Sequence, residues 1–364
     1  MEENAAENTL KDLPIQAENP AFAPGELIAC AKCERTNPPT RLACFYCGAE
    51  LEIGEDQIKN LKPNLRKLES WEKGFNLILS PVEGTFDEAK SAEIAKLLNL
   101  EREVLQKIFG VEKENHPGAS APPLLSEEGN FVPQSKEGNF VKALPLARAG
   151  TQKEAEIIGE RLREFNVETF ILSDEALEIE KPPVRLRALE FSAGAIILIF
   201  FNRDEIAEIA PEDLCLIVSG AIFERRLEAT EKRIKKGDNK ILQTTETVSD
   251  EFLIDVYTRK DPTGYRIFAK GFDFSCLEAE KEILAKDNLK KLARKLSEAA
   301  PNVRLIEDYL HVRENLGNVW EVEERKDSQG LKRQGFGRFN LGNVVTVNNS
   351  AQFTKYSRLQ WHLL

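Results

Sequence analysis

Apolar side chains recur along this chain at two spacings, one typical of helices and one typical of strands. Within residues 87–109 and 152–165 they return every three or four positions, which predicts amphipathic helices. Short apolar runs at 75–82 and 167–174 predict strands. Residues 75–174 therefore predict a compact unit with the order strand, helix, helix, loop, strand or turn, helix, strand.

Two helix starts in this unit carry a capping box. Thr85 with Glu88, and Thr151 with Glu154, have the spacing at which two side chains satisfy free backbone N–H groups of a first helical turn. Asn166 is expected to end the last helix, so that the final strand begins directly after it.

A second patterned region, rich in predicted strands, follows at 184–320. It contains the longest apolar run, 193–201, which is far too short to span a bilayer and predicts a buried strand. Residues 261–264, Asp-Pro-Thr-Gly, have the composition of a hairpin turn. A charged, polar stretch at 228–249 is expected to be an insertion. The helix predicted at 287–300 has one apolar face, formed by Leu289, Leu292, Ala293 and Leu296.

Residues 112–140 interrupt the pattern of the first unit. They contain a near-copy of nine residues, which starts at Ser126 and again at Ser135. A recognition motif present in two copies is one interpretation. We favour a duplicated flexible loop, because loops accept insertions at low cost in free energy.

These patterns predict an α+β multidomain protein. Its predicted parts are a disordered tail at 1–26, a zinc-ribbon module at 27–52, a linker at 53–74, an α/β domain at 75–174 with the loop insertion 112–140, a β-rich domain at 184–320 with the insertion 228–249, and a C-terminal extension at 321–364.

Cysteine spacing provides the strongest chemical signal in the chain. Cys30, Cys33, Cys44 and Cys47 follow the pattern C-x2-C-x10-C-x2-C, which is typical of a tetrahedral zinc site. Since all four ligands are thiolates, no coordination position stays open, and the single Zn²⁺ is expected to be structural. The two other cysteines, at 215 and 276, lie in apolar contexts and are expected to be small buried side chains.

The cysteine segment closely resembles the bacterial zinc-ribbon family, whose members follow a pattern like CxxCGxxNPPxxxFCxxCGxxL. The resemblance covers residues 27–51, and Glu34 replaces the usual glycine of the first knuckle. The matching positions are Asn37, Pro38, Pro39, Gly48 and Leu51. The segment also fits the pattern of Ran-binding-protein-type fingers, which bind ubiquitin or single-stranded RNA. We favour the generic ribbon, because Ile28 stands where those fingers usually carry tryptophan.

Residues 75–174 resemble the C-terminal domain of the bacterial ribosomal stalk protein and, more loosely, the Clp protease adaptor. The stretch PLARAGTQKEAEIIGERLREFNVETFILSD carries this resemblance, with a glycine before a capped helix and a pair like Glu164–Phe165 leading into a last strand. The resemblance implies a protein-binding α/β fold. The helices at 87–109 lack the glycine- and lysine-rich surface with which the stalk protein recruits translation factors.

The strands and helix at 184–300 resemble, in topology, a pleckstrin-homology-like split barrel, although no basic cluster typical of phosphoinositide binding is present. Further on, residues 332–343 mix glycine, phenylalanine, lysine and arginine. Such a mixture can stack nucleobases. We favour a glycine-rich loop whose phenylalanines pack inward.

Charge and missing motifs limit the possible functions. The formal net charge is −11, which disfavours polyanionic partners such as nucleic acid. The sequence has no P-loop, no H-E-x-x-H and no G-x-S-x-G, and its histidines, at 116, 311 and 362, are not next to a nucleophile. The acidic N-terminus has no secretory pattern, so we expect a cytoplasmic protein without membrane insertion.

These observations favour a non-enzymatic, zinc-binding adaptor or scaffold that mediates protein–protein interaction. The alternative is a nucleic-acid- or ribosome-associated factor that uses the zinc ribbon and residues 332–343 as contacts.

Overall fold

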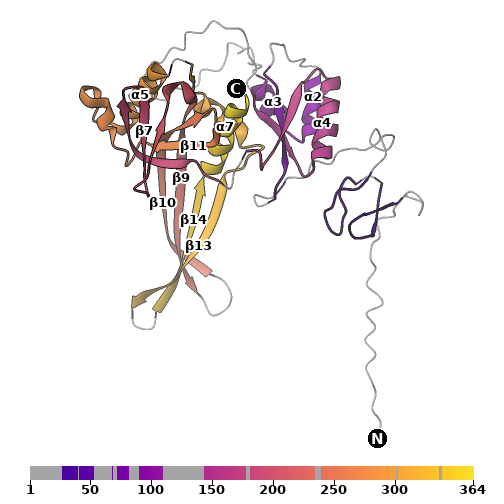
Figure 1. The fold of residues 1–364 in the computed structure, drawn as a ribbon. Coiled ribbons are helices and arrows are strands. Elements are labelled where there is room, and N and C mark those ends of the chain that lie inside the picture. The colour runs from indigo at the N-terminus through magenta and orange to yellow at the C-terminus, as the bar shows by residue number, and fades with distance from the viewer. Residues whose placement is uncertain are drawn as a thin grey trace, which may run out of the picture. The chain divides into compact units, whose positions relative to one another are not determined.

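The structure is a computed structural model, and it describes residues 27–39, 41–52, 68, 72–81, 90–109, 143–177, 181–233, 239–300, 302–335 and 338–364. The chain divides into two compact units, Met1–Asn64 and Leu65–Leu364 (Figure 1). The predicted tail at 1–26, the capping box of Thr85 and Glu88, and the loop 112–140 with its duplication lie outside the described residues.

The first unit consists of two turns held by short backbone pairings. Strands β1 (Ile28–Ala29) and β2 (Thr36–Asn37) pair antiparallel, and Ala43 forms an isolated bridge with Glu50. The buried side chains among its described residues are Cys30, Asn37, Cys44 and Leu51. So small a core needs further stabilisation, such as a cross-link or a bound metal, because burial of these few side chains does not offset the entropy lost when the chain is ordered.

The second unit begins with an α/β part that contains a three-stranded sheet. Its elements are β3 (Phe75–Leu79), α2 (Ser91–Leu98), α3 (Arg102–Ile108), β4 (Pro145–Ala149), α4 (Gln152–Glu164) and β5 (Thr169–Ser173). The strands lie in the order β4-β3-β5, and both pairings are antiparallel. This confirms the predicted order of helices and strands among the described residues of 75–174 and shows that the segment before α4 is a strand.

Helix α4 illustrates how the sequence determines this part. The side chain of Thr151 accepts a hydrogen bond from the backbone N–H of Glu154 at 3.2 Å, as the capping box predicts. The Glu154 carboxylate accepts from the backbone N–H of Gly150 at 3.0 Å. Asn166 ends the helix in the left-handed region, with φ at 61°. The apolar face of α4 is buried against the sheet.

The rest of the second unit is built on one large sheet. Its strands are β6 (Val184–Ser192), β7 (Ala195–Phe200), β8 (Ile206–Ile209), β9 (Leu214–Arg233), β10 (Asn239–Thr258), β11 (Asp261–Phe268), β12 (Arg304–Ile306), β13 (Glu323–Gly335) and β14 (Arg338–Asn348). Their order is β13-β14-β9-β10-β11-β6-β7-β8, and β12 pairs parallel with the beginning of β9. Most predicted short strands are therefore present, but β9 and β10 are much longer than predicted.

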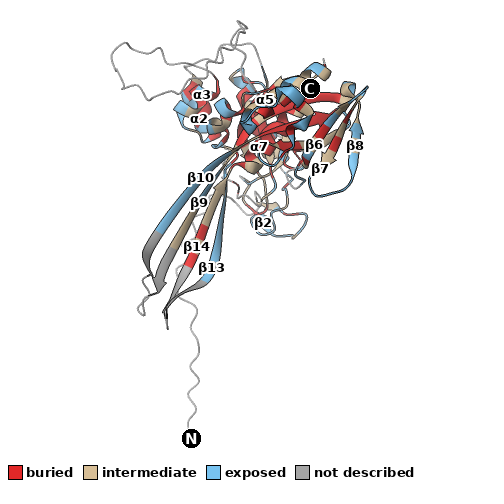
Figure 2. Cartoon of the chain, turned by 90° about the vertical axis from the view of Figure 1, so that its left-hand side faces the viewer, coloured by how far each residue is buried: buried red, intermediate tan, exposed pale blue. Residues whose placement is uncertain are grey.

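Four of these strands continue beyond the helix-covered part of the sheet as a ribbon (Figures 1 and 2). We call this the distal ribbon, and it comprises residues 224–233, 239–250, 323–335 and 338–348. The predicted insertion at 228–249 differs from the structure here, because β9 and β10 pair with each other at residues 228–233 and 239–249. Residues 228–249 are mostly polar or charged, so the sequence there lacks the alternation by which a half-buried strand is recognised.

Three helices cover parts of the sheet. Helix α5 (Ala285–Ala299) buries all four apolar residues predicted for its face, which confirms that helix. Helix α6 (Tyr309–Leu316) follows β12, and α7 (Ser350–His362) contacts both β9 and α6. None of the described helices is long and apolar enough to cross a membrane.

The C-terminal segment 321–364, predicted to be an extension, is built into this unit. Its strand β14 pairs with β9, and α7 buries every side chain from 352 to 360. Residues 332–335 and 338–343 belong to the strands of the β13–β14 hairpin, where Arg333 pairs in register with Phe339, and do not form the glycine-rich loop that was predicted.

One predicted turn lies two residues from its expected place. The hairpin between β10 and β11 turns at Arg259–Lys260, and Asp261 already pairs with Thr258. Gly264, with φ at 71°, lies inside β11, where a Cβ atom would be 2.5 Å from the ring of Tyr257. The glycine is therefore needed for close approach to this tyrosine.

Buried hydrogen bonds join the α/β part to the C-terminal part of the second unit. The indole N–H of Trp320 donates to the Asn76 side chain at 2.8 Å, and Arg358 donates to the carbonyl of Leu177 at 2.9 Å. Asp174 accepts from Asn76 at 3.0 Å and lies 3.5 Å from Lys355. These contacts lie within one compact unit, and the domain boundary predicted between 174 and 184 stays a prediction.

Candidate metal centre

Each cysteine pair lies on a tight turn that ends in a left-handed residue. Glu34 follows Cys33 with φ at 59°, and Gly48 follows Cys47 with φ at 70°. Each turn is closed by a backbone hydrogen bond, from Glu34 to Cys30 at 2.8 Å and from Gly48 to Cys44 at 2.9 Å. The first turn thus places a glutamate where its conformation favours glycine.

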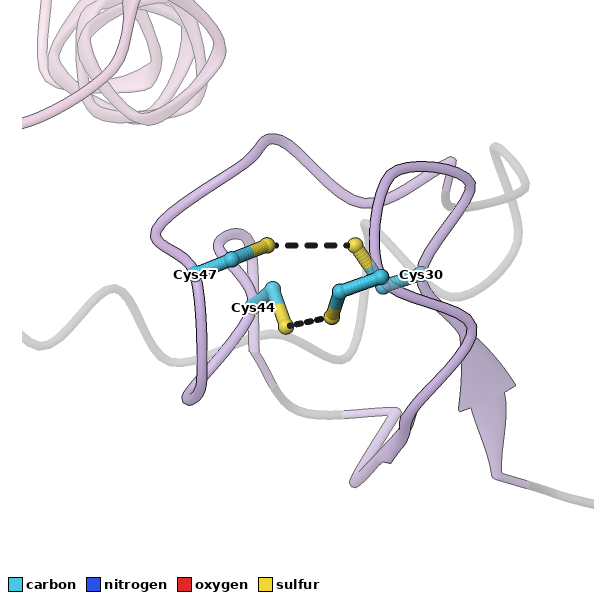
Figure 3. A group of neighbouring side chains, drawn as sticks. Cys30, Cys44 and Cys47 are labelled. Carbon is cyan, nitrogen blue, oxygen red and sulfur yellow. Dashed lines mark hydrogen bonds between the residues drawn. The ribbon is translucent and has the colours of Figure 1, made fainter.

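The two turns bring all four predicted ligands together (Figure 3). Their sulfur atoms lie within 4.8 Å of one another. The closest pairs each join the two knuckles, with 3.6 Å between Cys30 and Cys47 and 3.5 Å between Cys33 and Cys44. The separation expected in a tetrahedral zinc site with bonds of about 2.3 Å is about 3.8 Å. The donor set therefore fits Zn²⁺.

Asn37 is the side chain that organises the second turn. It is fully buried, and its amide donates to the carbonyl of Arg35 at 2.9 Å and to the sulfur of Cys44 at 3.5 Å. Its carbonyl oxygen accepts from the backbone N–H of Phe45 at 2.8 Å. Asn37 thus links β2 to the second knuckle and supports one ligand directly, which is the role of outer-shell residues in metal sites.

Neighbouring groups shift the pKa values of the Cys33 and Cys44 thiols in opposite directions. Burial raises the pKa of Cys44, but hydrogen bonds from the N–H groups of Tyr46 and Cys47 and from Asn37 outweigh it and lower the pKa to about 6. At Cys33 a backbone hydrogen bond lowers the pKa, while burial and the three neighbouring thiols raise it to about 12. A divalent cation would take the place of the protons that this cluster otherwise retains.

The second knuckle also presents two aromatic rings that the sequence analysis did not single out. Phe45 is 68% exposed and Tyr46 is 53% exposed, and their ring centroids lie 5.5 Å apart, edge to face. The guanidinium of Arg41 lies 5.0 Å from the Phe45 centroid, and that of Arg35 lies 4.7 Å from the Tyr46 centroid. The signal was the adjacent pair of aromatics between two ligands, but exposure cannot be deduced from sequence alone.

The second unit contains a cavity of about 310 Å³, and its lining residues include Cys276 and Lys295. Lys295 lies on its wall, donates to the carbonyl of Cys276 at 2.7 Å and lies 5.0 Å from the ring centroid of Phe191. Burial raises the pKa of Cys276 although Lys295 opposes the shift. The thiol therefore stays neutral, and a neutral thiol is a poor nucleophile.

The remaining predicted residues do not gather around a site. Cys215 is buried, and its thiol donates to the carbonyl of Tyr257 at 3.5 Å, whereas Cys276 is only partly buried. A ring nitrogen of His362 lies 3.0 Å from the carbonyl of Ala176. His116 lies outside the described residues. The four cysteines are therefore the predicted site residues that the fold brings together.

Comparison with known proteins gives no relative for this chain: no protein-family model, no curated protein and no solved structure matches it. The functional argument therefore rests on the chemistry of the chain's own residues.

Proposed function

We propose that this protein is a cytoplasmic, zinc-binding adaptor or scaffold that binds another protein and does not catalyse a reaction. The observation that carries the proposal is the second knuckle. Four cysteines close the candidate zinc site, and the same turn leaves Phe45 and Tyr46 exposed. A metal without an open position supplies structure, and exposed aromatic side chains are enriched at binding surfaces.

The surface of the second unit supports a binding role. The distal ribbon carries exposed, paired charges, such as Arg225 with Glu246 at 2.7 Å and Arg325 with Asp327 at 2.9 Å. Val344 is the one buried hydrophobic residue among the side chains that are described in the ribbon. The ribbon adds accessible surface at a distance from the hydrophobic core, which is useful for contact with a partner.

The resemblances found in the sequence are consistent with this role. The α/β part has the order of elements expected for a stalk-protein-like domain, and we propose this assignment for residues 75–174. We likewise propose a zinc ribbon at 27–52, where the left-handed Glu34 occupies the glycine position of that family. Both families use such modules to dock partners.

Cytoplasmic location follows from the thiol chemistry that we propose. Zinc binding requires reduced cysteines, and the described cysteines form no disulfide. A reducing compartment maintains that state.

A nucleic-acid-binding role is the second candidate. The pairing of Lys332 with Asn340 and of Arg333 with Phe339 brings basic and aromatic positions together on the β13–β14 hairpin. Opposing this, β13 also contains Glu323, Glu324 and Asp327, and the chain has a net charge of −11.

Affinity capture from native lysate tests the proposal. The full chain and its Cys44→Ser variant are each immobilised, and lysate is applied with and without nuclease. We expect a saturable protein partner that is retained after nuclease treatment and lost with Cys44→Ser. If nuclease removes all retained material, or if no protein is retained above the empty support, the adaptor proposal is wrong.

A further inference from the structure

We infer that the second knuckle is a docking surface for protein segments that combine an aromatic or large apolar side chain with adjacent carboxylates. The surface, which we call the aromatic knuckle, consists of Arg35, Arg41, Phe45 and Tyr46. This inference rests on the proposed function and names the chemistry of the partner.

The aromatic knuckle exposes apolar area that the small unit leaves in water. Phe45 and Tyr46 are both more than half exposed, whereas the largest fully buried side chains of the chain include Trp320, Tyr257 and Phe353. An aromatic side chain buries about 150–250 Å² when it is covered. A partner that covers both rings therefore gains an apolar anchor of the kind found at binding hot spots.

Local contacts hold the two rings in place before a partner arrives. The backbone N–H of Phe45 donates to Asn37 at 2.8 Å, and that of Tyr46 donates to the Cys44 sulfur at 3.4 Å. Since Asn37 and Cys44 are buried, the turn that carries the rings is fixed by the metal site. Preorganisation of this kind lowers the entropy lost on binding.

The two guanidinium groups define the charge of the partner. Each stacks over one ring, and neither forms an ion pair with a carboxylate in the described part of this unit. The Nε of Arg41 donates to the carbonyl of Ala43 at 3.4 Å, and its terminal N–H groups can still form a bidentate contact with a carboxylate. A segment with an apolar side chain and neighbouring Asp or Glu residues matches both features.

The small number of basic side chains limits how many anionic groups the aromatic knuckle can bind. Residues 27–52 contain three basic side chains, at 32, 35 and 41, and three acidic ones, at 34, 50 and 52, which gives a formal charge of zero. Four thiolates with one Zn²⁺ would bring this to −2, since −4 and +2 add to −2. Two carboxylates suit two arginines, whereas a polynucleotide brings one phosphate per nucleotide to a module without excess positive charge.

Selection from a random heptapeptide library displayed on phage tests the inference with the zinc-loaded full chain. We expect the enriched peptides to place Asp or Glu within two positions of an aromatic or large apolar residue. A synthetic copy of the most enriched peptide is then titrated by fluorescence anisotropy. Compared with the wild type, the double variant Phe45→Ala/Tyr46→Ala should bind this peptide with a Kd that is about tenfold higher or more. The double variant Arg35→Gln/Arg41→Gln should raise the Kd by a similar factor.

Phe201→Ala is the matched control, because Phe201 also lies under an arginine, Arg185 at 3.8 Å, but belongs to the second unit. It should leave the Kd unchanged, and every variant should retain one zinc per chain.

The inference is overturned if no peptide is enriched, if enriched peptides lack the acidic residue, or if the knuckle variants bind as tightly as the wild type. It is also overturned if a 20-nucleotide oligouridine displaces the peptide at submicromolar concentration. Retention of a lysate protein by the knuckle variants would then leave the adaptor proposal standing.

Discussion

Gly220 of β9 and Phe353 of α7 lie so close together that a Cβ atom on the glycine would be 2.3 Å from Cε2 of the ring. Phe353 is completely buried, and its ring centroid lies 4.8 Å from that of Tyr309. The ring therefore has no free space into which it can move. Helix α7 reaches the sheet at this point because position 220 carries no side chain.

Gly220→Ala should lower the free energy of unfolding by about 1–3 kcal/mol, the usual cost of overpacking a core. Urea denaturation that is monitored by circular dichroism measures this change in the stability of the second unit. Adding Phe353→Leu to Gly220→Ala should recover part of the loss, because the smaller side chain vacates the position of the clash. Equal stability of Gly220→Ala and wild type would contradict the described contact.

The two left-handed residues of the zinc turns predict substitutions of opposite effect. Glu34→Gly should stabilise the first unit by about 1 kcal/mol, since a side chain in this conformation is unfavourable by that amount. Gly48→Ala should destabilise it similarly, because φ at this position is 70°, which is unfavourable for a residue with a side chain. No atom lies within 4 Å of the added Cβ, so the conformation and not a clash is the cause. Competition with a chelator dye should show zinc affinity about fivefold tighter for the first and weaker for the second.

Removal of the metal should unfold the first unit and leave the second unit folded. Small zinc modules derive their folding free energy from metal binding, and this unit has few buried side chains. We expect one zinc per purified chain by elemental analysis. After chelation or Cys44→Ser, hydrogen exchange should lose protection in 27–52 only. Zinc-free protein with full protection there would show that the cysteines need no metal.

Acid stability should depend on Asp174. Burial raises the pKa of this carboxyl, but Lys355, Asn76 and Arg148 together lower it below its ordinary value. A lowered pKa means that the stabilisation is present above about pH 4 and is lost as the pH falls through the folded-state value. Asp174→Asn should cost about 3–5 kcal/mol at pH 7, because it leaves buried cations without their carboxylate.

Asp213→Asn provides the control for Asp174→Asn. Its carboxylate lies 3.1 Å from Lys260, whose side chain is 79% exposed. Loss of such an exposed pair should cost less than about 1 kcal/mol. Urea titrations at pH 7 and at about pH 2, well below the ordinary carboxyl pKa of about 3.9, compare the two variants, and the effect of Asp174→Asn should be smaller at the lower pH. Equal effects of both substitutions at pH 7 would refute the role of Asp174.

Alkaline pH should destabilise the second unit through its buried tyrosines. Burial raises the pKa of Tyr257, Tyr309 and Tyr356. A raised pKa means that the stabilisation is complete below the unfolded-state value of about 10 and is lost above it. Ultraviolet absorbance should therefore show tyrosinate appearing together with unfolding. Tyr257→Phe should reduce the slope of stability above pH 10, and an unchanged slope would argue against burial of this hydroxyl.

Local patterns in the sequence predicted much of this fold. The cysteine spacing identified all four members of the metal cluster, because short turns impose the geometry of each pair. The helices at 102–108 and 152–164 were predicted because each has one apolar face, and the cap at Thr151 fixed a helix start.

Other elements could not be predicted, because their surroundings decide their structure. Helix α7 contains Lys355 and Arg358 among its buried residues, and these find partners far away in the sequence, at Asp174 and Leu177. From the sequence, this stretch was therefore placed only in a C-terminal extension, and no helix was predicted there. The distal ribbon has the opposite problem, since Val344 is the one buried hydrophobic residue among its described side chains. In the sequence, Phe45 and Tyr46 look like core residues, because they are large and aromatic. Only the conformation of the turn shows that their rings are exposed.

The course of β9 has a mechanical consequence. This strand runs without interruption from Leu214 to Arg233, pairs with β12 near its start and pairs with β14 farther along. Twenty residues of strand span about 65 Å. A force applied at the far end of β9 is therefore carried in shear by many backbone hydrogen bonds at once, with no linker to absorb it. A force from a partner bound at the end of the ribbon would therefore be transmitted along β9 to the hydrophobic core.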